Sequence, residues 1–468
     1  MMLGDYTESK KYKNREMTKN MFFGKNLKKC TFAPLNTCNM QSINIITLGC
    51  SKNTVDSEHL ARQLAAMNYT LYFDSEKFTD VVIINTCGFI HDAKQESIDA
   101  ILHAVQAKEA GKIKKLYVIG CLSQRYADDL RAEIPEVDAF FGARGFNDIL
   151  QELKIEQKNE LLQERVITTP KHLAYLKLAE GCNRTCAFCA IPSIRGNYVS
   201  EPIENLVKEA NFLVQNGAKE LSLIAQDLSF FGYDLYKRNV LAELLEKLQP
   251  INGLEWIRLH YLYPNKFPKE VLDSMNQLSK VCHYIDIPFQ HASDKVLTKM
   301  RRFFSEKETF ALMEELKTKV PDIAIRTTLI VGHPGETEKE FQKLVDFVQQ
   351  AEFDRLGVFT YSHEEGTYAG EHYKDTIPDH VKQERQEIIM NLQQQISLKK
   401  NTEKIGKTFS VLIDRKESDG FVGRTQYDAY EVDNEVFIPE KKLHIGEFYP
   451  VTITEADTYD LVGCISKK

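Results

Sequence analysis

The chain has 468 residues, a length that suggests two to four domains. Apolar residues make up 43% and charged residues 27% of the chain, as in ordinary soluble globular proteins. The sequence contains no run of eighteen apolar residues, so no membrane-spanning helix is predicted. The net charge of −7 does not exclude a nucleic-acid partner, but it favours a basic protein partner or a small substrate.

Residues 1–40 carry eight Lys and Arg against three Asp and Glu and show little periodicity. This composition predicts a disordered basic arm, or an extension upstream of the true start, and no role is assigned to Cys30 and Cys38. The first residues lack the apolar core of a secretory signal, so a cytoplasmic protein is expected. In that compartment, ten cysteines indicate metal binding or catalysis rather than disulfides.

Residues 41–152 alternate between short apolar runs and helical patterns. This order predicts a parallel sheet covered by helices. The predicted strands are 43–49, 80–88 and 115–121, and the predicted helices are 55–68, 92–110 and about 123–133.

Residues 168–398 repeat the alternation on a larger scale and predict an open, barrel-like sheet of six βα units. A helical pattern at 201–217 ends at Gly217, as expected for a glycine C-cap. In such sheets the chemistry lies at the carboxyl ends of the strands. The predicted strands are 173–179, 220–226, 255–260, 283–288, 323–331 and 356–362.

The last part of the chain changes character. Residues 380–402 predict a long polar helix that serves as a connector, and residues 401–468 contain short strands and turns typical of a small β-barrel. This barrel carries nine Lys and Arg against thirteen Asp and Glu, a net charge of −4.

Three cysteines of the first domain, Cys50, Cys87 and Cys121, each directly follow a predicted strand. Because parallel strands end at the same edge, we expect these thiols to meet in space, where they would form a metal site with one open position. Small residues beside them would let the backbone approach a cofactor; these are Gly49, Gly88 and Gly120. The alternative is three buried structural cysteines.

A second set of three cysteines lies in the stretch GCNRTCAFCAIPSIRG, with the spacing C-x3-C-x2-C. The thiols are Cys182, Cys186 and Cys189, and Phe188 between the last two would shield a metal centre. Zinc sites usually have four ligands, and no fourth Cys or His lies at a suitable short distance. Three thiolates leave one metal position open, where a substrate can bind.

This spacing at the first strand of a βα sheet, with an aromatic residue before the last cysteine, resembles the radical S-adenosylmethionine (SAM) superfamily. The resemblance implies a 4Fe–4S cluster that binds SAM and cleaves it to methionine and a 5′-deoxyadenosyl radical. It also implies that residues at other strand ends line the SAM pocket: Gln226, Asp227, Arg258, His260 and the turn around Gly332.

The order of the three domains over residues 41–468 is similar to that of the methylthiotransferases, whose last domain is called TRAM. That resemblance implies a second 4Fe–4S cluster on Cys50, Cys87 and Cys121, which would hold the sulfur delivered to the substrate. One SAM would supply the methyl group and another the radical that abstracts hydrogen from a C–H bond. No catalytic residue is assigned beyond these ligands.

Two branches of this family differ in substrate. One modifies an adenosine near the anticodon of transfer RNA, and the other modifies the β-carbon of an aspartate in the twelfth protein of the small ribosomal subunit. The transfer-RNA branch typically has a basic residue where this chain has Glu365, whereas Tyr430 replaces a proline common in the ribosomal-protein branch. Segments that resemble the ribosomal-protein branch are 85–90, 225–227, 286–291, 361–367 and 422–433.

We therefore expect a ribosomal-protein substrate, free or within the ribosomal subunit, together with an electron donor and without stable nucleic-acid binding. The acidic barrel suits a basic partner, and Arg424 and Asp428 are candidate contacts. Three alternatives stay open: a transfer-RNA substrate, an iron–sulfur electron carrier without catalysis, and a barrel that only stabilises the other domains.

Overall fold

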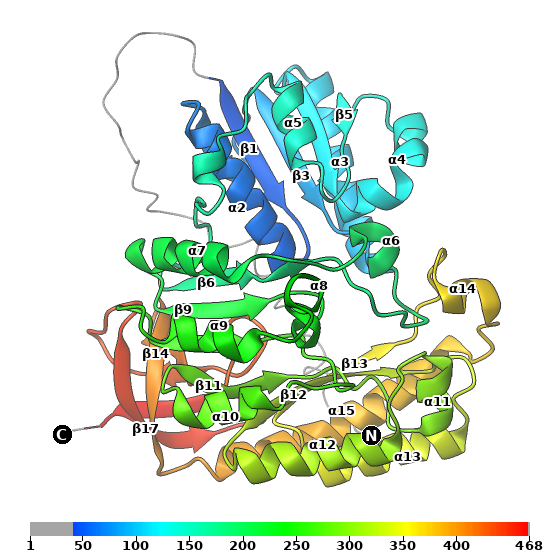
Figure 1. Ribbon diagram of the computed structural model, residues 1–468, viewed down its shortest axis with the longest axis vertical. Coiled ribbons are helices and arrows are strands. Elements are labelled where there is room, and N and C mark those ends of the chain that lie inside the picture. Colours follow the sequence, from blue (N-terminus) through cyan, green and yellow to red (C-terminus); the bar gives the residue numbers. More distant parts are fainter. Residues whose placement is uncertain (1–40, 467–468) are drawn as a thin grey trace, which may run out of the picture. The chain divides into compact units, whose positions relative to one another are not determined.

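The computed structural model describes residues 41–466 (Figure 1). The basic segment 1–40, with Cys30 and Cys38, lies outside the described residues. Residues 41–468 form one compact unit, so the boundaries between the three predicted domains stay predictions.

A five-stranded parallel sheet with the order β2-β1-β3-β4-β5 organises the N-terminal part, as the sequence predicts. All six residues of the central strand β3 are buried, which is typical of a strand covered on both faces. Strands β2 and β5 were not predicted. The elements are β1 (Ser42–Thr47), α2 (Ser51–Ala65), β2 (Thr70–Phe73), β3 (Val81–Thr86), α3 (His91–Glu109), β4 (Lys115–Gly120), α4 (Cys121–Glu133), β5 (Ala139–Phe140) and α5 (Phe146–Glu152).

The middle part contains the predicted open sheet of six parallel strands, in the order β13-β12-β11-β10-β9-β6. The strands are β6 (Leu173–Lys177), β9 (Glu220–Ile224), β10 (Trp256–Leu259), β11 (Val281–Asp286), β12 (Ala324–Val331) and β13 (Arg355–Thr360). The longer helices are α7 (Ile203–Gln215), α9 (Leu241–Leu248), α10 (Glu270–Gln277), α11 (Asp294–Lys299), α12 (Glu306–Lys319) and α13 (Glu338–Ala351).

Short elements join these units. They are η2 (Asn159–Leu161), β7 (Ala179–Glu180), α6 (Ile191–Arg195), β8 (Val199–Ser200), η3 (Leu228–Phe230), α8 (Tyr233–Tyr236) and α14 (Tyr368–His372). Gly217 follows α7 with φ +111° and donates to the carbonyl of Val214, which confirms the predicted glycine end of this helix.

The C-terminal part is a closed five-stranded barrel with the order β14-β15-β16-β18-β17. Helix α15 leads into it and is more than a connector, because it packs on β13 and α13 and buries Ile389 and Ile396. The elements are α15 (Asp379–Thr402), β14 (Thr408–Lys416), β15 (Phe421–Arg424), β16 (Val436–Ile438), β17 (Phe448–Ala456) and β18 (Leu461–Ile465).

Buried charges join this barrel to the six-stranded sheet. Glu220 of β9 accepts from Arg258 at 2.7 Å and pairs with Arg424 of the barrel at 3.0 Å. Arg424 also donates to Asp414 at 2.7 Å, and His172 contacts the same carboxylate at 2.9 Å. The barrel is therefore fixed to the sheet by a network that water does not reach.

The prediction that Arg424 and Asp428 contact a partner is wrong. Each is 1% exposed, and Asp428 accepts hydrogen bonds from Arg355 of β13. The ring of Tyr430 covers the Arg424 guanidinium, which lies 5.2 Å from the ring centroid. This distinctive loop faces the sheet, so its charges bind the barrel to the rest of the chain.

Candidate functional site

The first three cysteines lie at the carboxyl edge of the N-terminal sheet, as the sequence predicts. Cys50 is the N-cap of α2, Cys87 follows β3, and Cys121 is the first residue of α4 after β4. Strands β1, β3 and β4 are neighbours, so the three loops share one edge. We call these residues the N-domain triplet.

Glycines let the loops of the N-domain triplet approach one another. A Cβ atom on Gly49 would lie only 3.0 Å from the sulfur of Cys87, and one on Gly88 would lie 2.7 Å from the backbone nitrogen of Leu122. Gly120 adopts φ +111°, a conformation that strains other residues. A larger side chain at any of these positions would push the thiol-bearing loops apart.

Two buried amides fix the same edge. The Asn53 side chain donates to the carbonyls of Leu48 at 2.8 Å and Thr86 at 3.1 Å. The Asn85 side chain donates to the Asn53 carbonyl and to the Ser57 hydroxyl, both at 3.0 Å. The loops before Cys50 and Cys87 are therefore tied together independently of any cofactor.

Burial disfavours the thiolate forms of Cys87 and Cys121. Burial raises the pKa of Cys87 to about 11, and the neighbouring Cys50 and Cys121 add to the rise. Burial also raises the pKa of Cys121, although Arg195 opposes it. A bound iron centre would reverse this preference, because its positive charge favours thiolates.

The second set of thiols, Cys182, Cys186 and Cys189, lies on the loop between β7 and α6 and is called the loop triplet. Backbone hydrogen bonds shape the loop: Cys182 donates to Gly196 at 3.1 Å, and Cys189 donates to Cys186 at 3.2 Å. Burial raises the pKa of Cys182 to about 12 and that of Cys189 further.

Two arginines and a tyrosine surround the middle thiol of the loop triplet. A guanidinium nitrogen of Arg302 lies 3.5 Å from the sulfur of Cys186, and the Tyr263 hydroxyl lies 3.9 Å from it. The guanidinium groups of Arg302 and Arg184 both lie 4.0 Å from the Tyr263 ring centroid. Hydrogen bonds to a ligating sulfur tune an iron–sulfur centre, so these side chains suit a cluster bound here.

Helix α6 connects the two triplets. It begins two residues after Cys189, packs against α4 and ends at the buried Arg195. Arg195 donates to Asp56 at 2.8 Å and to Glu180 at 3.0 Å, and Cys121 belongs to one buried cluster with Ile194 of this helix. One short helix thus joins the loop triplet to a member of the N-domain triplet (Figure 1).

Two of the residues predicted to line the SAM pocket lie close to the loop triplet. Asp227 accepts from Arg184 at 2.7 Å, and Arg184 in turn donates its backbone N–H to the sulfur of Cys182. The side-chain oxygen of Gln226 is buried and has no hydrogen-bond partner among the described residues. An orphaned acceptor at this strand end fits a polar ligand.

The other predicted SAM contacts have structural partners. Arg258 is fully buried and points to Glu220 and the barrel, and Gly332 packs so closely on Lys382 that a Cβ would lie 2.3 Å from its side chain. Burial and Arg258 hold the pKa of His260 well below its usual range, so its ring is neutral. Their contact with SAM stays a prediction.

Sequence reasoning did not single out the arginines and tyrosine around the thiols. Arg195 lies in the stretch GCNRTCAFCAIPSIRG, six residues after Cys189, so its closeness in sequence to the thiols could have identified it. Tyr263 and Arg302 lie 77 and 116 residues from Cys186, and no local pattern marks them.

A polar clasp joins the N-terminal sheet to the loop after β13. Glu364 accepts from Lys94 of α3 at 2.8 Å and pairs with Arg125 of α4 at 3.3 Å. Arg125 also donates to the carbonyls of Gly88, beside the N-domain triplet, and of Glu365. The segment 361–367, noted in the sequence, therefore holds the two parts together near the thiols.

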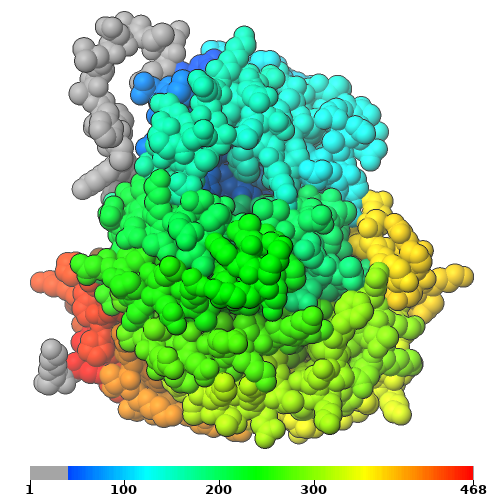
Figure 2. Space-filling model, in the orientation of Figure 1, coloured from blue at the N-terminus to red at the C-terminus, as the bar shows by residue number. Residues whose placement is uncertain are grey.

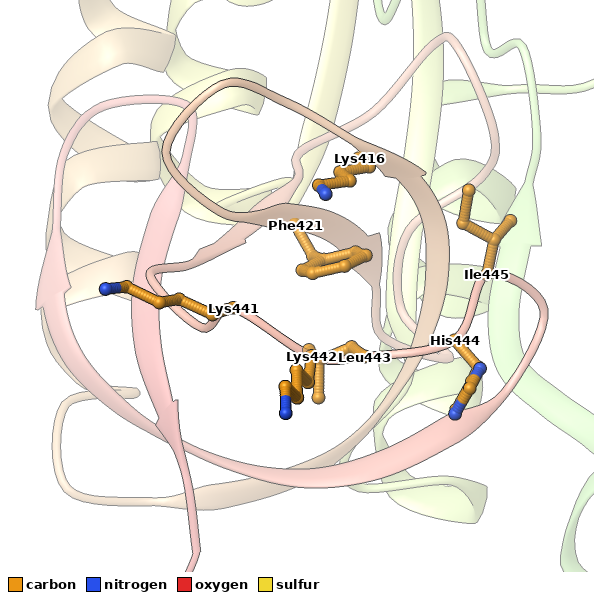
Figure 3. A pocket seen from close by; sticks show the side chains of 7 residues that line it. All are labelled: Lys416, Phe421, Lys441, Lys442, Leu443, His444 and Ile445. Carbon is orange, nitrogen blue, oxygen red and sulfur yellow. The ribbon is translucent and has the colours of Figure 1, made fainter. Parts of the chain in front are cut away.

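The C-terminal barrel carries a separate surface pocket of about 470 Å³ (Figure 3). Three lysines line the pocket together with Phe421, although the net charge of residues 401–468 is negative. Its lining residues are Lys416, Phe421, Lys441, Lys442, Leu443, His444 and Ile445. It contains no cysteine, so we assign it no part in the thiol chemistry.

The donor chemistry of both triplets fits iron–sulfur clusters, because each offers three thiols with close backbone support. Among residues 41–466, no group of three or more His, Cys, Asp or Glu side chains is arranged to hold a single metal ion. In a cubane cluster each thiolate binds a different iron, so its ligands are more widely spaced.

Three family models match the chain. They are uncharacterized protein family UPF0004 at residues 42–142, the radical SAM superfamily at 176–348 and the TRAM domain at 405–465. Membership of the radical SAM superfamily implies a 4Fe–4S cluster and SAM as cofactors. The N-domain triplet lies in the first match and the loop triplet in the second.

Curated relatives decide the family. The chain is 53% identical over 91% of its length to a protein of Phocaeicola vulgatus named ribosomal protein uS12 methylthiotransferase RimO, and the match covers 99% of that relative. The chain belongs to the RimO family. RimO proteins of Cytophaga hutchinsonii and Flavobacterium johnsoniae are each 52% identical over about nine tenths of the chain, and 98% and 97% of those relatives are covered.

Solved structures share the fold of this RimO-family chain at low identity. The radical SAM methyltransferase TsrM of Kitasatospora setae superposes with a TM-score of 0.53 at 12% identity, over 71% of this chain and 77% of that one. This likeness shows the fold alone. No helix of the described residues is long and apolar enough to cross a membrane.

Proposed function

We propose that this chain methylthiolates the β-carbon of an aspartate in ribosomal protein uS12. The observation that carries the proposal is the connection of the two thiol triplets through α6 and Arg195. Radical formation and sulfur transfer must act on the same substrate atom, so their two sites must lie close together. RimO-family relatives named for uS12 support this substrate over transfer RNA.

The loop triplet would hold the cluster that binds SAM, and the N-domain triplet would hold a second cluster. When bound, the clusters supply the electron that cleaves SAM and the sulfur that is transferred. The side chains of this protein position them: Arg302 and Tyr263 contact Cys186, and Ile194 packs with Cys121 in one buried cluster. Burial of these groups keeps water from a reactive radical.

Glu365, the position at which the transfer-RNA branch typically has a basic residue, lies beside the clasp. Its backbone carbonyl accepts from Arg125 at 2.9 Å, and its side chain is exposed. A basic residue at this position would face Arg125 with like charge. The backbone of Glu365 is therefore part of the clasp.

Mass spectrometry of uS12 from a strain that lacks this gene tests the proposal. We expect the methylthio-aspartate to disappear and to return when the gene is restored. An unchanged methylthio-aspartate would contradict the proposal, and loss of methylthio-adenosine from transfer RNA would indicate the other substrate.

Replacement of Cys50, Cys87 and Cys121 by alanine tests the second cluster. The purified protein should lose about half its iron, because each triplet holds one cluster, and should still form 5′-deoxyadenosine from SAM when reduced. Cys464→Ala, at an exposed cysteine outside both triplets, is the control and should keep full iron content. Absence of 5′-deoxyadenosine from the unaltered, reduced protein would indicate an electron carrier instead.

A further inference from the structure

One largely buried lysine side chain faces the junction between the two parallel sheets. Lys52, in the first turn of α2 and two residues beyond Cys50, is only 6% exposed. Its nitrogen lies 3.2 Å from the ring centroid of Tyr261, which follows the carboxyl end of β10. Lys52 therefore reaches from the N-domain triplet to the edge of the six-stranded sheet where SAM chemistry is expected.

This ammonium has no anion as its partner. Among the described residues, no carboxylate lies within ion-pair distance of Lys52, and its ammonium nitrogen contacts the ring of Tyr261. The nearby acids have other partners: Asp56 and Glu180 pair with Arg195 and Lys177. A cation–π contact leaves the N–H donors of the ammonium free to bind an anion.

The backbone that presents the ring is strained. Tyr261 adopts φ +60°, a left-handed conformation that is uncommon for an aromatic residue. The next residue, Leu262, donates its backbone N–H to the Asp286 carbonyl at 2.8 Å. Such strain is typical of residues that a binding site holds in place.

The face drawn in Figure 2 is hollowed between the cyan and the green parts of the chain. Blue residues from the start of the described chain form the floor of the hollow, and cyan and green residues of the two sheets form its walls.

We infer that Lys52 binds the side-chain carboxylate of the substrate aspartate and so sets the specificity of the reaction. The inference rests on the proposed function. A carboxylate held by Lys52 would place the adjacent β-carbon beside the N-domain triplet, because the lysine lies two residues from Cys50. SAM also carries a carboxylate, and the experiment separates the two sources.

The test uses holoenzyme with both clusters and two peptides of uS12, one with the target aspartate and one with asparagine in its place. We expect the unaltered protein to bind the aspartate peptide at least about 30-fold more tightly, as for a buried charge pair that loses one partner. In Lys52→Met the two peptides should bind within about 2-fold of each other, and Lys52→Arg should restore part of the preference. The affinity for SAM, and 5′-deoxyadenosine formation without peptide, should stay unchanged.

Lys77→Met is the matched control. Lys77 is exposed and lies 4.9 Å from the Tyr72 ring centroid, so it has the same cation–ring contact without the junction. Its variant should discriminate between the peptides like the unaltered protein.

Three results would overturn the inference: undiminished discrimination in Lys52→Met, weakened SAM binding with intact peptide discrimination, or no preference for aspartate in the unaltered protein. The last result needs no variant, so it decides the question even if Lys52→Met does not fold. Failure of the unaltered protein to methylthiolate the aspartate peptide would instead contradict the proposed function itself.

Discussion

At the scale of single residues, Arg195 completes a buried network of two acids and two bases. Asp56 and Glu180 accept from both Arg195 and Lys177, so the charges balance. Arg195→Gln leaves one negative charge without a partner, and we expect the free energy of unfolding to fall by about 3 kcal/mol or more. Urea denaturation measures this loss. The exposed pair of Arg131 and Asp128 gives the control: Arg131→Gln should change stability by less than about 0.5 kcal/mol.

The same network predicts a pH dependence. Burial alone would raise the pKa of Glu180, but Lys177 and Arg195 outweigh it and lower the pKa from 4.5 to about 2. Because the folded-state pKa is depressed, this stabilisation is complete above pH 4.5 and is lost as the pH falls toward 2. In Arg195→Gln the pKa of Glu180 should rise, so the acid-dependent loss should shrink. An identical pH profile in the variant would contradict the role given to Arg195.

Sequence patterns identify a site residue only when its place in the chain determines where it lies in the fold. The N-domain triplet was found because parallel strands end at one edge, and the loop triplet because its spacing is local. Arg302 meets Cys186 only through folding, so no pattern could identify it. The distinctive loop with Arg424 was interpreted as a contact surface, since a sequence does not tell which side of a loop is covered.

At the scale of elements, the contact between barrel and sheet depends on Glu220. It lies between the guanidinium groups of Arg258 and Arg424, and these outweigh burial and lower its pKa to about 2. Glu220→Gln leaves the buried Arg258 without a carboxylate, whereas Arg424 keeps Asp414, so the free energy of unfolding should fall by about 3 kcal/mol. Limited proteolysis should then cut before the barrel. Glu440→Gln, at an exposed site of the barrel, should behave like the unaltered protein.

The elements that the sequence missed are short or polar. Strands β2 and β5 have four and two residues, too few to show alternation. Helix α15 was interpreted as a connector because its polar average hides a narrow buried stripe that includes Ile389 and Ile396. Strands with continuous apolar runs, such as β3, were predicted because both of their faces are covered.

At the scale of the whole molecule, two contacts bring the N-terminal sheet and the six-stranded sheet together beside the thiols. One is α6 with Arg195, and the other is the clasp of Lys94 and Arg125 on Glu364. Neither contact follows from the separate domain patterns, because each joins residues that lie far apart in sequence. The family resemblance implies two clusters, and the structure adds the contacts that keep their sites adjacent.

The clasp should control the coupling between SAM cleavage and product formation. In Glu364→Gln the partly buried Lys94 and Arg125 lose their shared anion, so the N-domain triplet should be held less firmly over the other sheet. We expect the yield of methylthiolated product to fall by about 10-fold or more, because misplacement of reacting groups by about 1 Å lowers the rate by at least this factor. Formation of 5′-deoxyadenosine should stay within about 2-fold of the unaltered protein. Chromatography of both products from one reaction measures the ratio. Glu371→Gln, an exposed change in the same segment, should leave the ratio unchanged. A parallel loss of both products in Glu364→Gln would instead show that this residue supports the SAM site itself.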